Sequence, residues 1–198
     1  MKYKKINQNI IKEISNCLNA VDTKQTETLI EEILKAEKVF LTAVGRVNLS
    51  LQCFGKRLAH LGVNVELVGS LTEKPATKKD LLIIASGSGE SIIPISIAKK
   101  AKFHKTKIGI ITSANKSTLK RLCDFYVILK APTKKIVQGK LANQSLYDKA
   151  SKSSNSVQPM SSLFDQALHI YGDIVSLIIF NRKKYNKDDI WKYHANLE

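Results

Sequence analysis

Cysteine is scarce in this sequence, and the way its few cysteines are placed excludes two classes of small protein. Cys17, Cys53 and Cys123 are odd in number, lie far apart and form no CxxC pair. This pattern argues against a disulfide framework and against a zinc site, which needs closely spaced ligands. We therefore predict that the three cysteines are small, buried hydrophobic residues of a protein in a reducing compartment.

Long apolar runs are also absent. The longest, such as residues 81–85 and 174–180, fall well short of the roughly 20 residues that cross a bilayer. Residues 1–5 are basic, as in a signal peptide, but Asn7, Gln8 and Asn9 stand where an apolar segment should begin. The sequence thus predicts a cytoplasmic protein with no membrane span and no membrane partner.

Acidic residues are few, 17 against 32 lysines and arginines, which gives a formal net charge of +15. Such an excess raises the question of a polyanionic partner such as nucleic acid. A nucleic-acid interface usually interleaves arginine with aromatic residues on one stripe. Here the lysines are scattered, and the arginines are only Arg46, Arg57, Arg121 and Arg182. We interpret the charge as a lysine-biased surface and do not expect nucleic acid as a partner.

The hydrophobic pattern alternates between helical and strand-like segments. Apolar residues recur with helical spacing from Ile6 to Leu18, which predicts an amphipathic helix over about 5–20. Short continuous apolar runs, typical of buried parallel strands, then alternate with helical patterns. Strands are predicted at 38–44, 63–68, 80–85, 107–111 and 125–129, and helices at 26–36, 49–61, 92–103 and 116–122.

This alternation predicts a parallel, doubly wound sheet with helices on both faces. With 43% hydrophobic residues, the 198-residue chain can bury one substantial core, so we expect one domain over residues 1–198. Segment 131–158 breaks the pattern with Pro132, Gly139 and a serine cluster, and we interpret it as a loop insertion. Two carboxyl-terminal helices are predicted after it, within about 160–194.

One turn has the chemistry of a phosphate site. It directly follows the strand at 80–85 and opens the helix at 92–103, and its residues are Ser86, Gly87, Ser88, Gly89, Glu90 and Ser91. Ligands of open parallel sheets bind beyond the carboxyl ends of the strands. The glycines permit close approach, the helix start offers unpaired N–H groups, and three hydroxyls can donate to phosphate oxygens. The turn therefore predicts binding of a phosphate monoester.

Two other interpretations of this turn fit less well. It lacks the lysine of a P-loop and the GxGxxG of a dinucleotide fold, so a nucleoside triphosphate or NAD is not expected. A helix cap in a tight turn explains Ser88 or Ser91 alone but not the whole hexapeptide.

A second candidate turn follows the strand at 38–44 and includes Gly45, Arg46 and Val47. Arg46 could clamp an anionic or hydroxylated ligand. As a single arginine in a loop, it could equally be a solvated charge.

Together the two turns, the order of strands and helices and the carboxyl tail resemble the sugar isomerase (SIS) domain, and within it the 6-phospho-3-hexuloisomerases. The resemblance runs from about Ile10 to Glu198, apart from the insertion. The matching segments are 45–46, 57–62, 80–83, 86–91, 110–113, 158–160, 163–164 and 194–198. The Pro-Met start of the helix at 159–160 and the His-Ala-Asn-Leu-Glu ending are more specific than the turn, which isomerases share with regulators.

The resemblance implies a three-layer α/β/α sandwich around a five-stranded parallel sheet of flavodoxin-like order, and a homotetramer. It also implies a reaction of the ribulose monophosphate pathway, the interconversion of D-arabino-3-hexulose 6-phosphate and fructose 6-phosphate through an enediolate, with no metal or cofactor. Asp165 matches the family's catalytic glutamate. His194 matches a carboxyl-terminal histidine that could shuttle protons or open the sugar ring, or could instead be a cap or subunit contact.

Three features differ from the family pattern: the first turn, one loop and the residue at the base position. Val47 and Asn48 stand where Gly-Arg-Ser-Gly is usual, and loop 69–75 lacks the usual Thr-Thr-Pro run. The carboxylate of Asp165 lies about 1.5 Å nearer the backbone than that of a glutamate, and a displacement of that order can cost about a hundredfold in rate. These differences leave open an alternative, a catalytically weak SIS module that binds a sugar phosphate as a sensor or regulator. Sensors of this fold usually carry an added DNA-binding domain, which we do not expect here.

Overall fold

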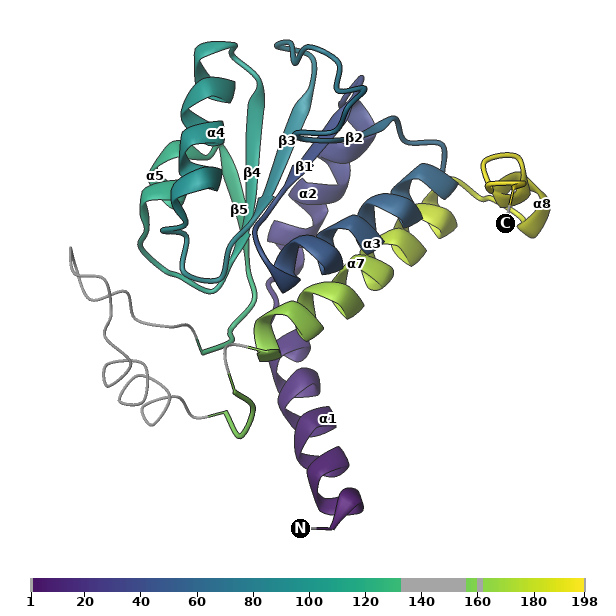
Figure 1. Ribbon diagram of the computed structural model, residues 1–198. Coiled ribbons are helices and arrows are strands. Elements are labelled where there is room, and N and C mark those ends of the chain that lie inside the picture. The colour runs from purple at the N-terminus through teal and green to yellow at the C-terminus, as the bar shows by residue number, and fades with distance from the viewer. Residues whose placement is uncertain (1, 133–155, 160–161, 198) are drawn as a thin grey trace.

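A parallel β-sheet forms the centre of the computed structural model, which describes residues 2–132, 156–159 and 162–197 (Figure 1). Its five strands lie in the order β2-β1-β3-β4-β5, which confirms the predicted flavodoxin-like order. The strands are β1 (Val39–Thr42), β2 (Val65–Leu67), β3 (Leu81–Ala85), β4 (Lys107–Thr112) and β5 (Phe125–Ile128). Most of the predicted insertion at 131–158 lies outside the described residues.

Helices cover both faces of the sheet, as predicted. One face packs against α2 (Thr23–Lys35), α3 (Arg46–His60) and α7 (Ser162–Arg182), and the other against α4 (Ile92–Phe103) and α5 (Thr118–Leu122) (Figure 1). The side chains of β3 alternate between the two hydrophobic clusters, because successive residues of a strand point to opposite faces. Leu81 and Ile83 join the cluster with α3, whereas Leu82 and Ile84 join the cluster with α4.

Helix α7 packs closely along α3. Phe54 of α3 lies against Gly172 of α7, where an added Cβ would stand 2.8 Å from the Phe54 Cβ atom, so this approach requires glycine. Among the described helices, α7 alone is long and apolar enough to span a membrane by length and composition. However, 56% of its apolar window is buried inside the protein, as in the core helix of many folds.

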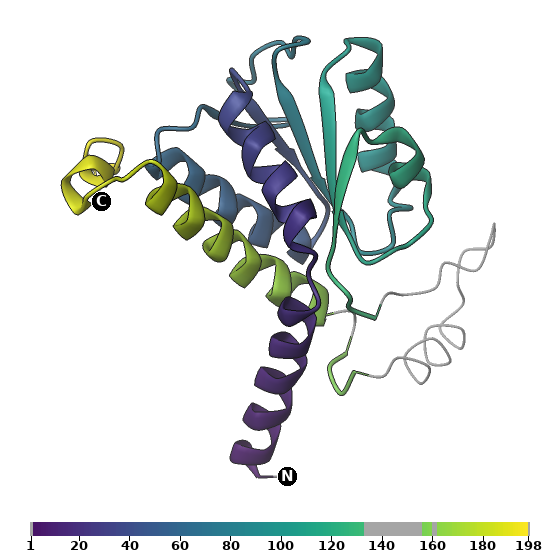
Figure 2. The ribbon, with the colours of Figure 1, turned by 180° about the vertical axis from the view of Figure 1, so that it is seen from behind.

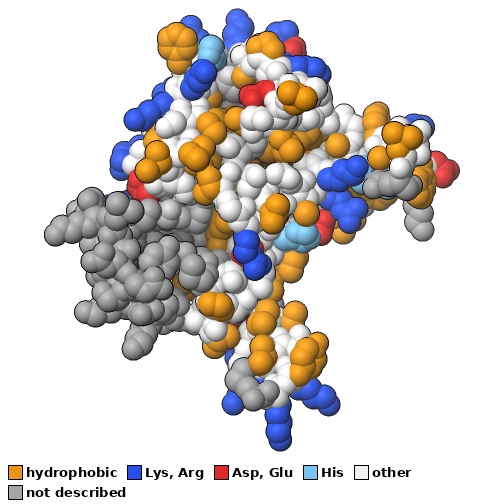
Figure 3. Space-filling model, viewed as in Figure 1, with side chains coloured by type: hydrophobic (Ala, Val, Ile, Leu, Met, Phe, Trp, Pro, Cys, Tyr) orange, Lys and Arg blue, Asp and Glu red, His pale blue; other side chains and the backbone are white. Residues whose placement is uncertain are grey.

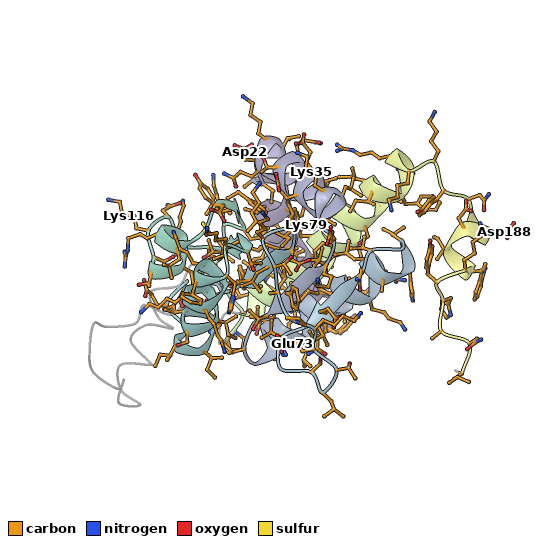
Figure 4. All side chains as sticks on the ribbon, turned by 90° about the horizontal axis from the view of Figure 1, so that it is seen from above. Asp22, Lys35, Glu73, Lys79, Lys116 and Asp188 are labelled. Carbon is orange, nitrogen blue, oxygen red and sulfur yellow. The ribbon has the colours of Figure 1, made fainter. Side chains whose placement is uncertain are left out.

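Two helices extend away from the sheet. Helix α1 (Tyr3–Asn19) projects as an arm and buries only Ile14 and Cys17, while Ile10 and Leu18 are half-buried on the same stripe (Figure 2). The short helix α8 (Lys187–Trp191) stands beyond the far end of α7. In a view from above, α8, marked by Asp188, lies on the opposite side of the molecule from Lys116, which precedes α5 (Figure 4).

The prediction that all three cysteines are buried was wrong. Cys17 is buried, and this burial raises the pKa of its thiol to about 11. Cys53 is exposed, because the core-facing stripe of α3 runs through its neighbours Leu51 and Phe54 and leaves position 53 on the solvent side. Cys123, just after α5, is partly exposed.

The basic side chains do not gather into one stripe on the face seen in Figure 3. Lysines and arginines stand at separate places around this face, with apolar side chains between them (Figure 3). This distribution agrees with the interpretation of the charge as a lysine-biased surface.

Candidate functional site

The turn at residues 86–91 lies at the carboxyl edge of the sheet, between β3 and α4. Ser86 fastens it: its N–H donates to the carbonyl of Ile111 on β4 over 3.0 Å, and its Oγ accepts from Gly89 N over 3.1 Å. The hydroxyls of Ser86 and Ser91 lie 3.2 Å apart. Because Ser86 is buried, its hydroxyl holds the turn together, and Ser88 and Ser91 are the half-buried hydroxyls nearer to solvent.

Gly89 lets the turn pack against α5. Its φ of +66° is a conformation that side chains rarely adopt. A Cβ atom at this position would stand 2.2 Å from Ser117 Oγ. The carbonyl of Gly89 also accepts from Leu119 N over 3.1 Å. The turn therefore requires glycine at position 89, both for the positive φ and for the close contact with Ser117.

Several backbone N–H groups of the turn are unpaired. Among the residues that the structure describes, no acceptor pairs with the N–H groups of Gly87, Ser88 or Ser91. Ser91 is the residue before α4, and its side chain makes no capping bond to that helix. Unpaired N–H groups beside the positive end of a helix dipole favour an anion. We call this group of donors, from Gly87, Ser88, Ser91 and the first turn of α4, the anion cradle.

The side chain of Glu90 forms a structural hydrogen bond to α5. Its Oε1 accepts from Thr118 N over 2.7 Å, at the first residue of α5. Sequence reasoning placed Glu90 among the ligand-binding residues. The structure shows it joining the turn to α5, and a carboxylate adds no donor for phosphate.

The second turn lies at the end of β1, beside β3 in the sheet. Helix α3 begins at Arg46, three residues earlier than predicted, and Gly45 precedes it with φ +61°. Arg46 is therefore a first-turn helical residue and not a loop residue. Val47 is half-buried and packs against the hydrophobic cluster below α3, so its side chain contributes to the core.

Arg46 and Asp165 form an ion pair. Arg46 Nε donates to Asp165 Oδ2 over 2.8 Å, and the two residues are 119 positions apart in the sequence. The Asp165 side chain is only 7% exposed, whereas that of Arg46 is 71% exposed. Asp165 Oδ1 has no hydrogen-bond donor in the described part of the chain. The pair thus presents one oxygen of a nearly buried carboxylate beside an accessible guanidinium.

His194 lies elsewhere in the same chain. Its ring stacks on that of His60, the last residue of α3, with centroids 4.9 Å apart, and Trp191 lies 4.8 Å from it. Arg46 is the first residue of α3, and the 14 residue steps between them correspond to about 21 Å along the helix axis. Within one chain, His194 is therefore at the opposite end of α3 from the Arg46–Asp165 pair.

Thr112 and Ser113 also belong to this edge, although the sequence gave them no role beyond a matching segment. Thr112 ends β4, the neighbour of β3, and both residues bond to the carbonyl of Gly87. The sequence signal that could have identified these two residues was a polar pair at the end of the buried strand beside β3. Across residues 2–132, 156–159 and 162–197, no cluster of three His, Cys, Asp or Glu residues could hold a metal ion.

Comparison with known proteins decides the family. The SIS domain matches residues 32–170, a stretch that holds both turns, Thr112 and Asp165. The chain belongs to the SIS domain family.

Two similar proteins match almost the whole chain. A Bacillus subtilis protein named 3-hexulose-6-phosphate isomerase is 30% identical over 189 residues, 96% of this chain and 95% of the relative. The solved structure of a Methanococcus jannaschii protein has a TM-score of 0.77 at 28% identity, covering 98% of this chain and 99% of that one. A molecular function of 3-hexulose-6-phosphate isomerase is inferred for that protein.

A relative of a different class matches part of the chain. An uncharacterized HTH-type transcriptional regulator from Thermotoga maritima is 29% identical over 136 residues, 66% of this chain and 48% of the regulator. The long isomerase matches support a sugar-phosphate isomerase of the SIS family, with a sugar phosphate as its small-molecule ligand.

Proposed function

We propose that this SIS protein interconverts D-arabino-3-hexulose 6-phosphate and fructose 6-phosphate. The observation that carries the proposal is the Arg46–Asp165 pair, which stands at the end of β1 while the anion cradle stands at the end of the adjacent strand β3. A base and an anion site at one edge of a sheet suit a substrate with a phosphate at one end and a reacting carbonyl at the other.

Asp165 is the proposed base. It takes the proton from the carbon next to the carbonyl, and the electron pair of that C–H bond forms the enediolate. Asp165 then gives the proton to the former carbonyl carbon, and the hydroxyl proton moves to the former carbonyl oxygen, so atoms and charges balance. The nearly buried position of Asp165 limits contact between its carboxylate and bulk water.

Arg46 has two proposed tasks. Its Nε holds Asp165 in place over 2.8 Å, and its exposed terminal nitrogens can donate to the oxygens on which enediolate charge develops. The phosphate is held by the unpaired N–H groups and the hydroxyls of the anion cradle. Fixing the phosphate fixes the distance between the reacting carbons and Asp165.

His194 acts, in this proposal, on the site of another subunit. The separation of about 21 Å along α3 prevents it from reaching Asp165 of its own chain. In the homotetramer that we propose, the protruding α8 and its tail would bring His194 to a neighbouring Arg46–Asp165 pair. There it would assist ring opening or proton transfer between oxygens.

The test is incubation of the protein with fructose 6-phosphate in heavy water, followed by NMR. We expect deuterium at carbon-bound positions and appearance of the 3-hexulose isomer. Asp165→Asn should still bind the sugar phosphate, measured by thermal stabilisation, but exchange deuterium at least about a hundredfold more slowly. Exchange that is equally fast in Asp165→Asn would remove Asp165 from the mechanism.

The second candidate function is a sensor that binds the sugar phosphate without turning it over. Two observations favour it. The side chain of Val47 packs against the core at the position where the family pattern has a serine. A transcriptional regulator is also similar to part of the chain. Binding of fructose 6-phosphate with no deuterium exchange in the unmodified protein would support the sensor. An absence of binding would argue against both candidates.

A further inference from the structure

The carbonyl of Gly87 is held from the β4 side by two hydrogen bonds. Thr112 Oγ1 donates to it over 3.2 Å, and Ser113 N donates to it over 3.1 Å. Thr112 Oγ1 also accepts from Ala114 N over 3.2 Å. The Thr112 side chain is completely buried, so no solvent competes for these bonds. The orientation of the Gly87 carbonyl is therefore fixed by the last residue of β4 and the residue after it.

A fixed carbonyl fixes the N–H of the same peptide group. Peptide groups are planar and the N–H of a trans peptide points opposite to the C=O. Because the Gly87 carbonyl is directed to β4, the N–H of Ser88 is directed away from β4. The strand on the other side of β3 is β1. No acceptor among the described residues pairs with Ser88 N–H, which leaves it available to a ligand.

The side of β3 toward β1 is where the connections diverge. After β1 the chain enters α3, on one face of the sheet, and after β3 it enters α4, on the other face. The carboxyl ends of two strands at such a divergence are the usual ligand position in this type of sheet. Arg46 begins α3 just after β1. Ser88 N–H and Arg46 thus belong to the two connections that flank this position.

We propose that Thr112 is a positioning residue of the anion cradle. By holding the Gly87 carbonyl, it presents the N–H of Ser88 to the phosphate of the sugar phosphate, without touching the ligand itself. A donor that is already oriented loses little freedom when the ligand binds, so its hydrogen bond contributes more to affinity. This inference rests on the proposed function for its ligand, and it adds a residue of β4 to a site otherwise built from the turn after β3, the starts of α3 and α4, and α7.

Two variants of Thr112 and one control variant test the proposal. Thr112→Val keeps the shape of the side chain but removes the hydroxyl, and we expect fructose 6-phosphate to bind about tenfold more weakly, as for the loss of one well-placed hydrogen bond. Thr112→Ser restores the hydroxyl and should restore affinity to within about twofold. In turnover, Thr112→Val should raise KM with little change in kcat, because the phosphate is bound equally in the ground and transition states.

The matched control is Thr106→Val at the opposite end of β4. Thr106 is also buried, 3% exposed, and its Oγ1 has no partner in the described structure. This variant should bind the ligand as the unmodified protein does. Equal affinity of Thr112→Val and Thr106→Val, or no rescue by Thr112→Ser, would overturn the positioning role.

Inorganic phosphate separates this inference from the proposed function. If the unmodified protein binds phosphate but not fructose 6-phosphate, the proposed function fails, and the same three variants titrated with phosphate still decide the role of Thr112. Should Thr112→Val fail to fold, the amide NMR signal of Ser88 in the unmodified protein decides instead. We expect a downfield shift on adding phosphate, and an unmoved signal at saturating phosphate would overturn the proposal.

Discussion

At the scale of single residues, the proposed site depends on side chains that hydrogen bonds and an ion pair keep in place. Arg46 orients Asp165, and Ser86 and Thr112 hold the turn that forms the anion cradle. Asp165, which we propose as the catalytic base, is one methylene shorter than glutamate. Its partner on α3 sets where the carboxylate stands, so the effect of the shorter side chain depends on that ion pair as well as on side-chain length.

Gly89 is the residue at which a small change should damage the cradle most. Gly89→Ala combines an unfavourable φ with a Cβ atom 2.2 Å from Ser117 Oγ. We expect a loss of about 2–3 kcal/mol of unfolding free energy and weaker binding of inorganic phosphate, measured by urea unfolding and calorimetry.

Gly69→Ala is the control for this change. Gly69 has φ +86° but no atom within 4 Å of an added Cβ, so it isolates the backbone cost. It should lose only about 1 kcal/mol and leave phosphate binding intact. Equal losses at both positions would show that the contact with Ser117 is relaxed without cost.

At the scale of elements, the proposed site requires β1 and β3 to stay in register. An ion pair with a buried carboxylate fixes their amino-terminal ends: Lys38 Nζ lies 3.0 Å from Asp80 Oδ2, which also accepts from Thr77 N and Thr77 Oγ1. Burial alone would raise the pKa of Asp80. The hydrogen bonds from Lys38 and Thr77, with the charge of Lys38, outweigh it and hold the pKa below its ordinary value of 3.8.

This depressed pKa predicts a pH-dependent contribution to stability. Because the folded state favours the carboxylate, the contribution is present above the ordinary value and is lost as pH falls through the lower pKa of the folded state. Asp80→Asn should therefore lower the unfolding free energy by about 3 kcal/mol at pH 7, and the gap from the unmodified protein should narrow in acid below the ordinary value. Urea unfolding at pH 7 and pH 3 measures both.

Glu37→Gln provides the matched control at the same edge of the sheet. Glu37 pairs with Lys79 over 2.7 Å, but both side chains are more than half exposed. Its loss should cost less than about 1 kcal/mol. A gap for Asp80→Asn that stays constant down to pH 3 would contradict the assignment to the Asp80 carboxylate.

At the scale of the whole molecule, the proposed catalytic residues lie at two ends of the fold. Helices α3 and α7 place Arg46 and Asp165 at one end, and the tail after α8 places His194 on His60 at the other. The protruding α1 and α8 give the chain two extensions that one copy leaves largely uncovered (Figures 1 and 2). Assembly is therefore the step that we propose to complete the catalytic set.

Complementation between two inactive variants tests that step. Asp165→Asn and His194→Ala should each lose most of their turnover. Co-expressed and purified as mixed oligomers, they should regain activity, because about a quarter of randomly assembled sites would combine one intact Asp165 with one intact His194. Measured turnover that stays at the level of the single variants, in oligomers shown to be mixed, would place both residues in one chain's site or His194 outside it.

Local sequence pattern was sufficient to predict the strands and most of the helices. Continuous apolar runs predicted β3 and β4. The glycines and serines of residues 86–91 predicted a tight turn before a helix, because their effects act over a few residues. Helix boundaries were less certain: α3 begins at Arg46 and α2 begins at Thr23, where Asp22 accepts from Lys24 N and caps the helix. These caps depend on backbone geometry that hydrophobic periodicity does not record.

What only the tertiary structure decided is which distant residues meet. The sequence named Arg46 and Asp165 separately, and the packing of α3 along α7, permitted by Gly172 against Phe54, joins them. The same packing put Cys53 in solvent and His194 at the far end of α3. Contacts across 119 positions arise from how faces of helices pack in three dimensions, whereas the sequence records directly only those interactions that act between near neighbours.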